Sequence, residues 1–200
     1  MDNPAETIAA AARGDEAAQR SLYESYHGAA SRLAYLLLSD ANDAEEVVQD
    51  AFVYVLRNLR RYDAERGSFW AWLRVVLVSR SRNKRRRRQL ALVELEALTE
   101  NEEPRDSSSW GDDPASLLEL SHTRRAVWGA LQQVSSGARD ALILRYYEGL
   151  PYEQVSVVLG CSAEAARARV AHGKRQLRLM LAGLADEAAA PVGAPVKKAV

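Results

Sequence analysis

The sequence predicts an all-α protein made of two small helical domains joined by an acidic flexible linker. Apolar residues recur with the 3.6-residue period of a helix, and the two-residue alternation of strands is nearly absent. Hydrophobic residues make up 48% of the 200 residues, which is enough to build buried cores. Between residues 99 and 116 the composition changes to Glu, Asp, Ser and Pro. Such a stretch cannot bury enough apolar area to offset its ordering entropy.

The first domain, residues 1–90, is predicted to be a bundle of long helices. Apolar stripes at helical spacing end near Leu38, Leu59 and Leu77. The segment 63–67 interrupts the pattern as a turn, and a basic run follows the third stripe, where cations suit the negative end of the helix dipole. The residues that can cap the three helices are Asp15, Asp43 and Ser68.

Residues 91–116 are assigned to the acidic linker, residues 117–184 to a second helical domain, and residues 185–200 to a loose tail. Trp110, inside the linker, is either an anchor or an incidental aromatic residue. Helical periodicity returns after the linker. Four helices fit the second domain: 117–133, 136–147, 151–158 and 162–181.

The net charge is zero, from 27 basic and 27 acidic residues, but the charges are strongly segregated. Residues 1–59 carry −6, residues 60–88 carry +9, residues 94–119 carry −8 and residues 163–180 carry +4. Two basic blocks separated by an acidic one indicate two polyanion-binding surfaces with an acidic connector. The plain alternative is that solvated helix faces happen to cluster.

The second domain contains a helix-turn-helix pattern over residues 151–178. Leu159-Gly160-Cys161-Ser162 follows a short apolar helix, glycine suits the tight turn, and Ser162 can cap the longer basic helix. In such a motif the second helix enters the major groove of DNA. An ordinary helical hairpin with a basic outer face is the alternative, and Cys161 is expected to be a small buried turn residue. The candidate DNA-contacting residues are Ser162, Arg167, Arg169, His172, Lys174 and Arg175.

No constellation typical of an enzyme is found. The three histidines have no metal-ligand spacing to one another or to Cys161, and no phosphate-cradling or nucleophile motif is present. Glu45 and Glu46 are better explained as a solvated helix face than as an acid–base pair. We therefore expect no catalytic residue, no metal site and no cofactor. Without a long apolar run or a secretory signal, the chain is expected to be cytoplasmic and not inserted in a membrane.

Two blocks of sequence resemble a known family. Residues 43–52 (Asp-Ala-Glu-Glu-Val-Val-Gln-Asp-Ala-Phe) and 69–73 (Phe-Trp-Ala-Trp-Leu), followed by the arginine run, resemble region 2 of a bacterial sigma factor. Residues 144–155 (Leu-Arg-Tyr-Tyr-Glu-Gly-Leu-Pro-Tyr-Glu-Gln-Val), with Leu159-Gly160 and residues 167–170, resemble region 4. This arrangement is similar to that of the extracytoplasmic-function subgroup of sigma factors, which consists of region 2, a short linker and region 4 with nothing else.

The resemblance implies three sets of site residues. In the family, the second helix of region 2 docks on the clamp helices of the largest polymerase subunit. The loop and helix that follow capture an unstacked base of the −10 promoter element, and region 4 binds the −35 element through the candidate residues named above. The set for core polymerase is Glu46, Gln49 and Asp50. The set for the −10 element is Asp63, Arg66, Ser68, Trp70, Arg74 and Arg80.

The resemblance further implies a function without enzymatic activity. The chain would bind core RNA polymerase as an alternative sigma factor, direct it to specific promoters and assist promoter opening at transcription initiation. Its partners would be core polymerase, promoter DNA and an anti-sigma factor. The alternative is a stand-alone helix-turn-helix transcriptional regulator that binds duplex DNA as a dimer. His172 departs from the family, which commonly has arginine there, and Trp72 is expected in the core.

Overall fold

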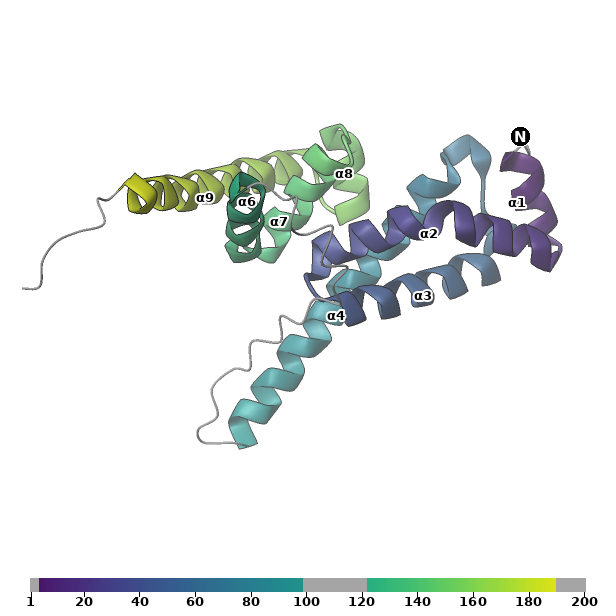
Figure 1. Cartoon of the computed structure of the whole chain (residues 1–200). Coiled ribbons are helices and arrows are strands. Elements are labelled where there is room, and N and C mark those ends of the chain that lie inside the picture. The colour runs from purple at the N-terminus through teal and green to yellow at the C-terminus, as the bar shows by residue number, and fades with distance from the viewer. Residues whose placement is uncertain (1–3, 99–121, 190–200) are drawn as a thin grey trace, which may run out of the picture.

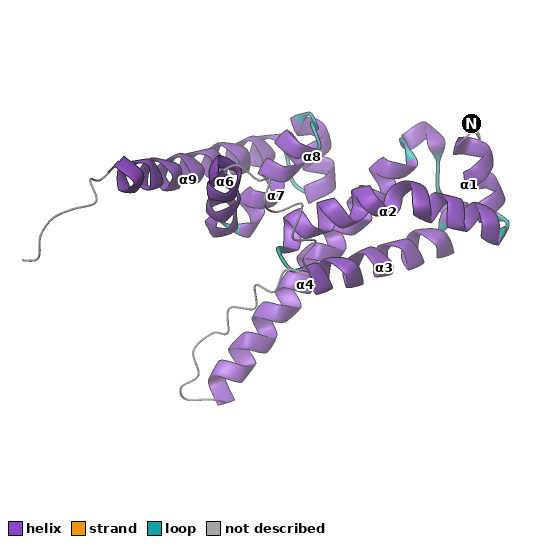
Figure 2. Cartoon of the chain, in the orientation of Figure 1, coloured by secondary structure: helices purple, strands orange, loops and turns teal. Residues whose placement is uncertain are grey.

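The computed structural model describes residues 4–98 and 122–189, and all regular elements in these two segments are helical (Figure 2). This confirms the all-α prediction. Residues 99–121, which include most of the predicted linker 91–116 with Trp110, and residues 190–200 of the predicted tail 185–200 lie outside the described segments. Within the described segments, no helix combines the length and the apolar character needed to cross a membrane.

The N-terminal domain is a helical bundle whose long helices α2, α3 and α4 pack on one another (Figure 1). The Asp15 carboxylate accepts a hydrogen bond from the Ala18 amide at 3.0 Å, as predicted for a cap. Ser68 likewise accepts from the Ala71 amide at 3.2 Å. The elements are α1 (Pro4–Ala12), α2 (Glu16–Leu38), α3 (Ala41–Arg57), the short 3-10 turns η1 (Leu59–Arg61) and η2 (Ala64–Arg66), and α4 (Phe69–Leu98).

The cap of α3 differs from the prediction. Asp40, not Asp43, caps this helix, because the Asp40 carboxylate accepts from the Asp43 amide at 2.9 Å. Ser39 adopts a left-handed conformation with φ 61°, which ends α2 and lets α3 begin almost at once. Asp43 therefore lies in the first turn of α3, where the positive end of the helix dipole stabilises its negative charge. Its carboxylate also forms an ion pair with Lys84.

Helix α4 continues through Leu98, beyond the predicted domain boundary at residue 90. Residues 90–98 read Leu-Ala-Leu-Val-Glu-Leu-Glu-Ala-Leu, and most of them are strong helix formers, so the helix propagates past the arginine run. Figure 1 shows these last turns projecting away from α2 and α3. Helix α1, whose Ile8 and Ala11 are buried in the core, was not predicted.

The C-terminal domain contains the predicted helix-turn-helix. Gly160 has φ 61°, a left-handed conformation that glycine adopts without strain, and Ser162 accepts from the Ala165 amide at 3.1 Å as the cap of the long helix. Cys161 is half-buried rather than buried. The elements are α6 (His122–Gln133), α7 (Ser136–Leu142), one π-helical turn η3 (Ile143–Tyr147), α8 (Tyr152–Leu159) and α9 (Ala163–Ala189).

The two domains contact each other, which the prediction of two domains on a flexible tether did not anticipate. Helix α4 packs against α8, and the Tyr35 ring of α2 stacks on Trp128 of α6 with 5.6 Å between ring centroids. On the N-terminal-domain side, the contact is formed by α4 and by the corner between α2 and α3. On the C-terminal-domain side, it is formed by α7, the end of α8 and Glu148, which follows η3. This contact places part of the candidate DNA surface inside the molecule.

Candidate polymerase and promoter interfaces

The polar face of α3 lies in the open, as the helical periodicity predicts. The side chains of Glu46 and Asp50 are 60% and 59% exposed, whereas Val48 and Phe52 on the opposite side are buried. Gln49 is also exposed, and its amide donates to the Glu45 carboxylate at 3.1 Å. The three residues assigned to core polymerase therefore share one accessible surface.

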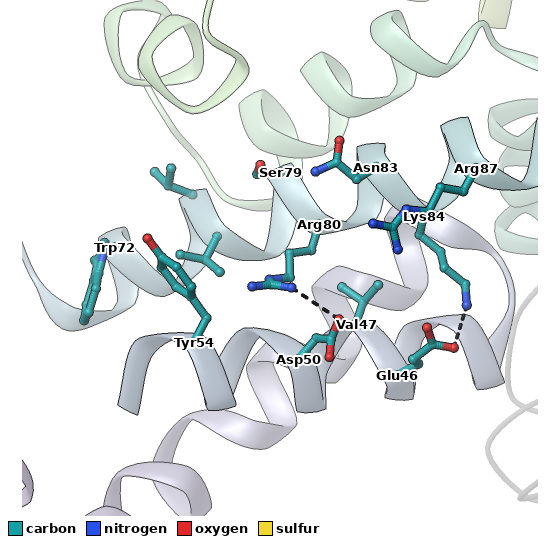
Figure 3. Close-up of a pocket in the computed structure, with 12 residues that line it drawn as sticks. Glu46, Val47, Asp50, Tyr54, Trp72, Ser79, Arg80, Asn83, Lys84 and Arg87 are labelled. Atoms are coloured by element: carbon teal, nitrogen blue, oxygen red, sulfur yellow. Dashed lines mark hydrogen bonds and ion pairs between the residues drawn. The ribbon is translucent and has the colours of Figure 1, made fainter. Parts of the chain in front are cut away.

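Basic side chains of α4 meet that surface across a groove (Figure 3). Arg80 donates to the Asp50 carboxylate at 3.3 Å, and the Lys84 ammonium lies 2.5 Å from a Glu46 oxygen. The hydrogen bond to Glu46 raises the pKa of Lys84, although burial opposes the shift. The groove has a volume of about 450 Å³, and its floor includes Val47 and Trp72. The groove is thus lined by apolar side chains and by side chains of both positive and negative charge.

Arg80 is thus placed beside the polymerase set, although it was assigned to the −10 set. Its guanidinium also lies over the Tyr54 ring, 5.4 Å from the centroid. No spacing in the sequence indicated the partner, because Asp50 is thirty positions away along the chain. Trp72, expected in the core, is half-buried and packs against the core, and its ring meets Phe69 edge-on at 6.2 Å between centroids.

The loop before α4 carries three exposed residues of the −10 set, Asp63, Arg66 and Ser68. Asp63 accepts from the Glu65 amide at 3.0 Å and pairs with Arg66 at 3.2 Å, so the two side chains order the turn η2. Gly67 has φ 142°, a conformation that favours glycine, and its carbonyl accepts from the Tyr62 hydroxyl at 3.0 Å.

A cavity of about 680 Å³ adjoins this loop. Tyr62, Gly67 and Trp72 line its N-terminal-domain side, while Leu150 and Val157 of the C-terminal domain line the other. Burial raises the pKa of the Tyr62 hydroxyl, with Tyr26 and Asp63 adding to the effect. The cavity offers aromatic surface together with hydrogen-bonding groups, which is the chemistry that holds an unstacked base.

Trp70 and Arg74 reach into the contact between the domains, and Arg74 also lines the cavity. The Trp70 indole donates to Glu148 at 3.0 Å, and its ring stacks on Tyr26 with 6.3 Å between centroids. Arg74 donates to the same Glu148 oxygen at 3.1 Å and is only 7% exposed. Trp70 therefore lies apart from the exposed loop residues, whereas Arg74 is buried but lines the same cavity as they do. Glu148 was missed, because it follows two exposed tyrosines and shows no pattern of its own.

The basic face of α9 presents most of the −35 set. Arg167, His172, Lys174 and Arg175 are exposed or partly exposed, and Ser162 caps the helix at its exposed N-terminal end. Arg167 pairs with Glu153 of α8 at 3.0 Å. The guanidinium of Arg167 also lies over the Tyr152 ring, 5.4 Å from the centroid. A shallow cavity of about 470 Å³ is lined by Tyr152, Arg167, Val170, Lys174, Arg175 and Arg178.

Arg169 stands apart from this face. It is half-buried and lines a different cavity, together with Arg82, Arg85 and Arg86 of α4. Two residues of a helix are about 200° apart at this spacing, so Arg167 and Arg169 point to opposite sides. Arg178 joins the exposed basic face but was not predicted as a site residue. Its position four residues after Lys174 is the signal that identifies it.

Potential metal ligands are dispersed. In the residue ranges 4–98 and 122–189, no three His, Cys, Asp or Glu side chains come together as a metal site. The chemistry of the described surfaces is that of charge, hydrogen bonding and aromatic contact.

Comparison with known proteins assigns both domains. A family model for sigma-70 region 2 matches residues 22–91, and one for sigma-70 region 4 matches residues 124–177. Over 191 residues the chain is 30% identical to the ECF RNA polymerase sigma factor SigE of Mycolicibacterium smegmatis, covering 94% of this chain and 72% of that relative. It is 26% identical over 179 residues to the RNA polymerase sigma-H factor of Pseudomonas aeruginosa, covering 88% of this chain and 92% of that one.

Solved structures share the fold. The sigma factor RpoE of Bartonella quintana, in complex with the anti-sigma factor NepR, matches with a TM-score of 0.61 and 21% identity, covering 81% of this chain and 95% of that one. CnrH, in complex with the cytosolic domain of CnrY, matches with a TM-score of 0.61 and 22% identity, covering 91% and 99%. The two matched regions, in this order and together with the relatives that share them, show that the chain belongs to the extracytoplasmic-function subgroup of the RNA polymerase sigma factors.

Proposed function

We propose that this sigma factor binds core RNA polymerase, directs it to specific promoters and helps to open them, without catalytic activity of its own. The single observation that carries the proposal is the presence of both matched regions, residues 22–91 and 124–177, in one chain. A stand-alone helix-turn-helix regulator would account for the second region but not for the first. The protein would act in the cytoplasm.

Core polymerase would dock on the polar face of α3. Glu46, Gln49 and Asp50 are accessible together, and a carboxylate-rich patch suits a basic partner. Arg80 and Lys84 already hold two of these carboxylates. Docking would therefore exchange intramolecular ion pairs for intermolecular ones. Exposed pairs of this kind contribute only about 0–1 kcal/mol, so the exchange is energetically accessible.

Promoter opening would use the loop Asp63–Ser68 and the aromatic residues beside it. Extracting a base from the duplex costs a few kcal/mol, to be offset by stacking and by a fitted pocket. Tyr62 and Trp72 supply aromatic surface along the adjoining cavity. Trp70 would join them once the C-terminal domain no longer covers it.

Recognition of the −35 element would use the exposed basic face of α9. Ser162 and Arg167 lie at the N-terminal end of the helix, the end that reads base edges in a helix-turn-helix. Lys174 and Arg175 lie further along and suit phosphate contacts. Arg169 would act as a positioning residue, because it faces α4 rather than the exposed face.

An anti-sigma factor is the proposed regulatory partner. The proteins of similar fold were solved in complex with NepR, an anti-sigma factor, and with the cytosolic domain of CnrY. The groove between α3 and α4 and the exposed Tyr54 at its edge offer a surface that such a protein could cover. Covering it would also block the proposed polymerase site.

The test is run-off transcription by purified core polymerase on genomic promoter fragments, with and without this protein. We expect new transcripts that begin at defined start sites only when the protein is present. A second arm measures binding of the free protein to duplex DNA. Tight binding to a palindromic site at physiological salt, with no effect on core polymerase, would overturn the proposal and favour the stand-alone regulator.

A further inference from the structure

We propose that Tyr152 and Glu153, at the start of α8, are positioning residues: they hold the Arg167 guanidinium of α9 in the orientation that reads a base of the −35 element. The inference rests on the proposed role of α9 in −35 recognition. It gives the first helix of the helix-turn-helix a part in sequence specificity. The contacts that support it lie within the C-terminal domain.

The Glu153 contact fixes one edge of the guanidinium. Nη2 of Arg167 donates to Oε1 of Glu153 at 3.0 Å. A guanidinium carries five N–H donors in a planar fork, so the bond to Glu153 leaves donors for a bidentate contact with a base. The Arg167 side chain is 53% exposed, so these donors are accessible from solvent. Glu153 therefore orients the guanidinium without using all of its donors.

The Tyr152 ring supports the face of the same group. The guanidinium carbon of Arg167 lies 5.4 Å from the ring centroid, which is a cation–π distance. Tyr152 is half-buried and packs against the core, and the Arg145 guanidinium also lies over its ring, 5.0 Å from the centroid. Arg145 is held in turn, because it donates to the Leu150 carbonyl at 3.0 Å. Arg167 thus lies over a ring that the folded domain fixes.

The backbone determines where these side chains begin. The Pro151 carbonyl accepts from the amides of Gln154 and Val155, both at 3.0 Å, so the first turn of α8 is closed by hydrogen bonds. Glu153 lies in this turn, where the positive end of the helix dipole stabilises its charge. Arg167 lies in the second turn of α9, near the end that contacts base edges in a helix-turn-helix.

Other exposed cations of α9 lack this support. Within the described ranges, Arg167 forms an ion pair, whereas Lys174, Arg175 and Arg178 form none. Contacts to phosphate position a protein on DNA without reading its sequence, whereas contacts to base edges depend on the geometry of the donors. A flexible cation suits the first task, and a held guanidinium suits the second. This difference assigns base reading to Arg167.

The ion pair is worth more to binding than to stability. The side chains of Arg167 and Glu153 are 53% and 67% exposed, and such a pair adds little to the free energy of unfolding. An arginine that is already oriented, however, loses less conformational freedom when it meets a base. Loss of Glu153 should therefore weaken specific DNA binding and leave the domain folded.

The test is a double-mutant cycle with the full-length protein bound to core polymerase, on a −35-dependent promoter found by run-off transcription. Glu153→Ala removes the carboxylate and places a strong helix former in α8. We expect roughly threefold weaker promoter complexes, in line with the small energy of an exposed ion pair. In the Arg167→Ala background, Glu153→Ala should cause no further loss, because its effect passes through Arg167. Binding of the free protein to random-sequence duplex should not weaken, since a negative charge near the phosphates is removed.

A second readout separates positioning from a general structural role. Each base pair of the −35 element is changed in turn, and the pair read by Arg167 is the one at which Arg167→Ala no longer discriminates. Glu153→Ala should discriminate less at that pair and normally at the others, whereas a structural defect would weaken binding to all sequences. Gln154→Ala, the same truncation at the next exposed position of α8, is the control and should keep the wild-type pattern.

Two results would overturn the positioning role. One is an equal loss on Glu153→Ala with and without Arg167, and the other is unchanged promoter binding by a folded Glu153→Ala. Circular dichroism checks folding, and if Glu153→Ala is not folded, Glu153→Gln takes its place in the cycle.

Failure of the proposed function is distinguishable from these results. No transcript with the wild type, or no loss of promoter binding on Arg167→Ala, would remove the role of α9 itself. The positioning role fails alone when Arg167→Ala weakens the promoter complex and Glu153→Ala does not.

Discussion

The two basic helices α4 and α9 use their charges differently. Arg74, Arg80, Lys84, Arg85 and Arg88 of α4 all pair with acidic side chains. On α9, in the part of the chain that the structure describes, an ion pair is formed by Arg167 and not by Lys174 or Arg175. Five cations of α4 are therefore engaged within the protein, while Lys174 and Arg175 of α9 remain available for phosphate. Clustered positive charge in a sequence does not by itself indicate a DNA-binding surface.

The largest expected effect tests the structural role of α4. Replacing Arg85 by Ala leaves the buried Asp140 carboxylate without its ion-pair partner, so the free energy of unfolding should fall by about 3 kcal/mol. Lys174→Ala is the matched control on α9, where loss of an exposed cation should change stability by less than about 0.5 kcal/mol. Urea unfolding followed by circular dichroism measures both. Equal free energies of unfolding for the two variants would show that the cations of α4 and α9 do not differ in their structural role.

The next prediction tests the DNA-binding role of α9. Arg167→Ala should weaken promoter complexes that depend on a −35 element by about 1–3 kcal/mol if a bidentate base contact is lost. Arg169→Ala should have the smaller effect, since Arg169 faces α4. Both variants should bind core polymerase normally. Promoter-complex formation and core affinity are measured for each variant, and normal initiation by both at every −35-dependent promoter would rule out α9 as the reader.

A smaller effect is expected on the polymerase face. Asp50→Arg reverses a charge that is accessible on α3, so affinity for core polymerase should fall by about 1 kcal/mol or more. The melting temperature should hardly change, because the lost pair with Arg80 is largely exposed. Fluorescence anisotropy of labelled protein with core polymerase provides the measurement. Unchanged affinity in a folded variant would remove Asp50 from the interface.

The smallest effect concerns pH. Burial and the nearby Asp40 raise the pKa of Tyr35 from 10.0 to about 12. The neutral form is thus favoured in the folded state, so its contribution to stability is complete below pH 10 and is lost as the pH rises through 12. Absorbance at 295 nm should show one tyrosine fewer titrating near pH 12 in Tyr35→Phe. Loss of a tyrosine that titrates near pH 10 would contradict the assignment.

Local patterns in the sequence predicted local structure well. Asp15, Ser68 and Ser162 are caps as expected, and the turn at Gly160 separates the two helices of the helix-turn-helix. These predictions succeed because a cap and its amide lie three residues apart. The prediction that Asp43 caps α3 was wrong, because Asp40, three residues earlier, takes the cap position and accepts from the Asp43 amide.

Contacts between distant residues could not be predicted in this way. Glu148 meets Trp70 and Arg74 across more than seventy positions, and no periodicity within either segment indicates the partner. For the same reason Arg74 was assigned to a DNA surface, although its side chain is buried. By contrast, the shared exposure of Glu46, Gln49 and Asp50 could be predicted, because the three residues lie on one face of one helix.

The π-helical turn η3 (Ile143–Tyr147) lets the chain hold an extra residue beside the interdomain contact without altering that contact. The Glu148 amide donates to the Ile143 carbonyl at 3.1 Å, five residues back, so this turn holds one residue more than an α-helical turn. The turn still completes one revolution, so the extra residue is absorbed within it. Deletion of one residue here should therefore restore an ordinary α-helical turn and leave Glu148 facing Trp70 and Arg74. The length of this segment can change by one residue while the contact with the N-terminal domain is kept.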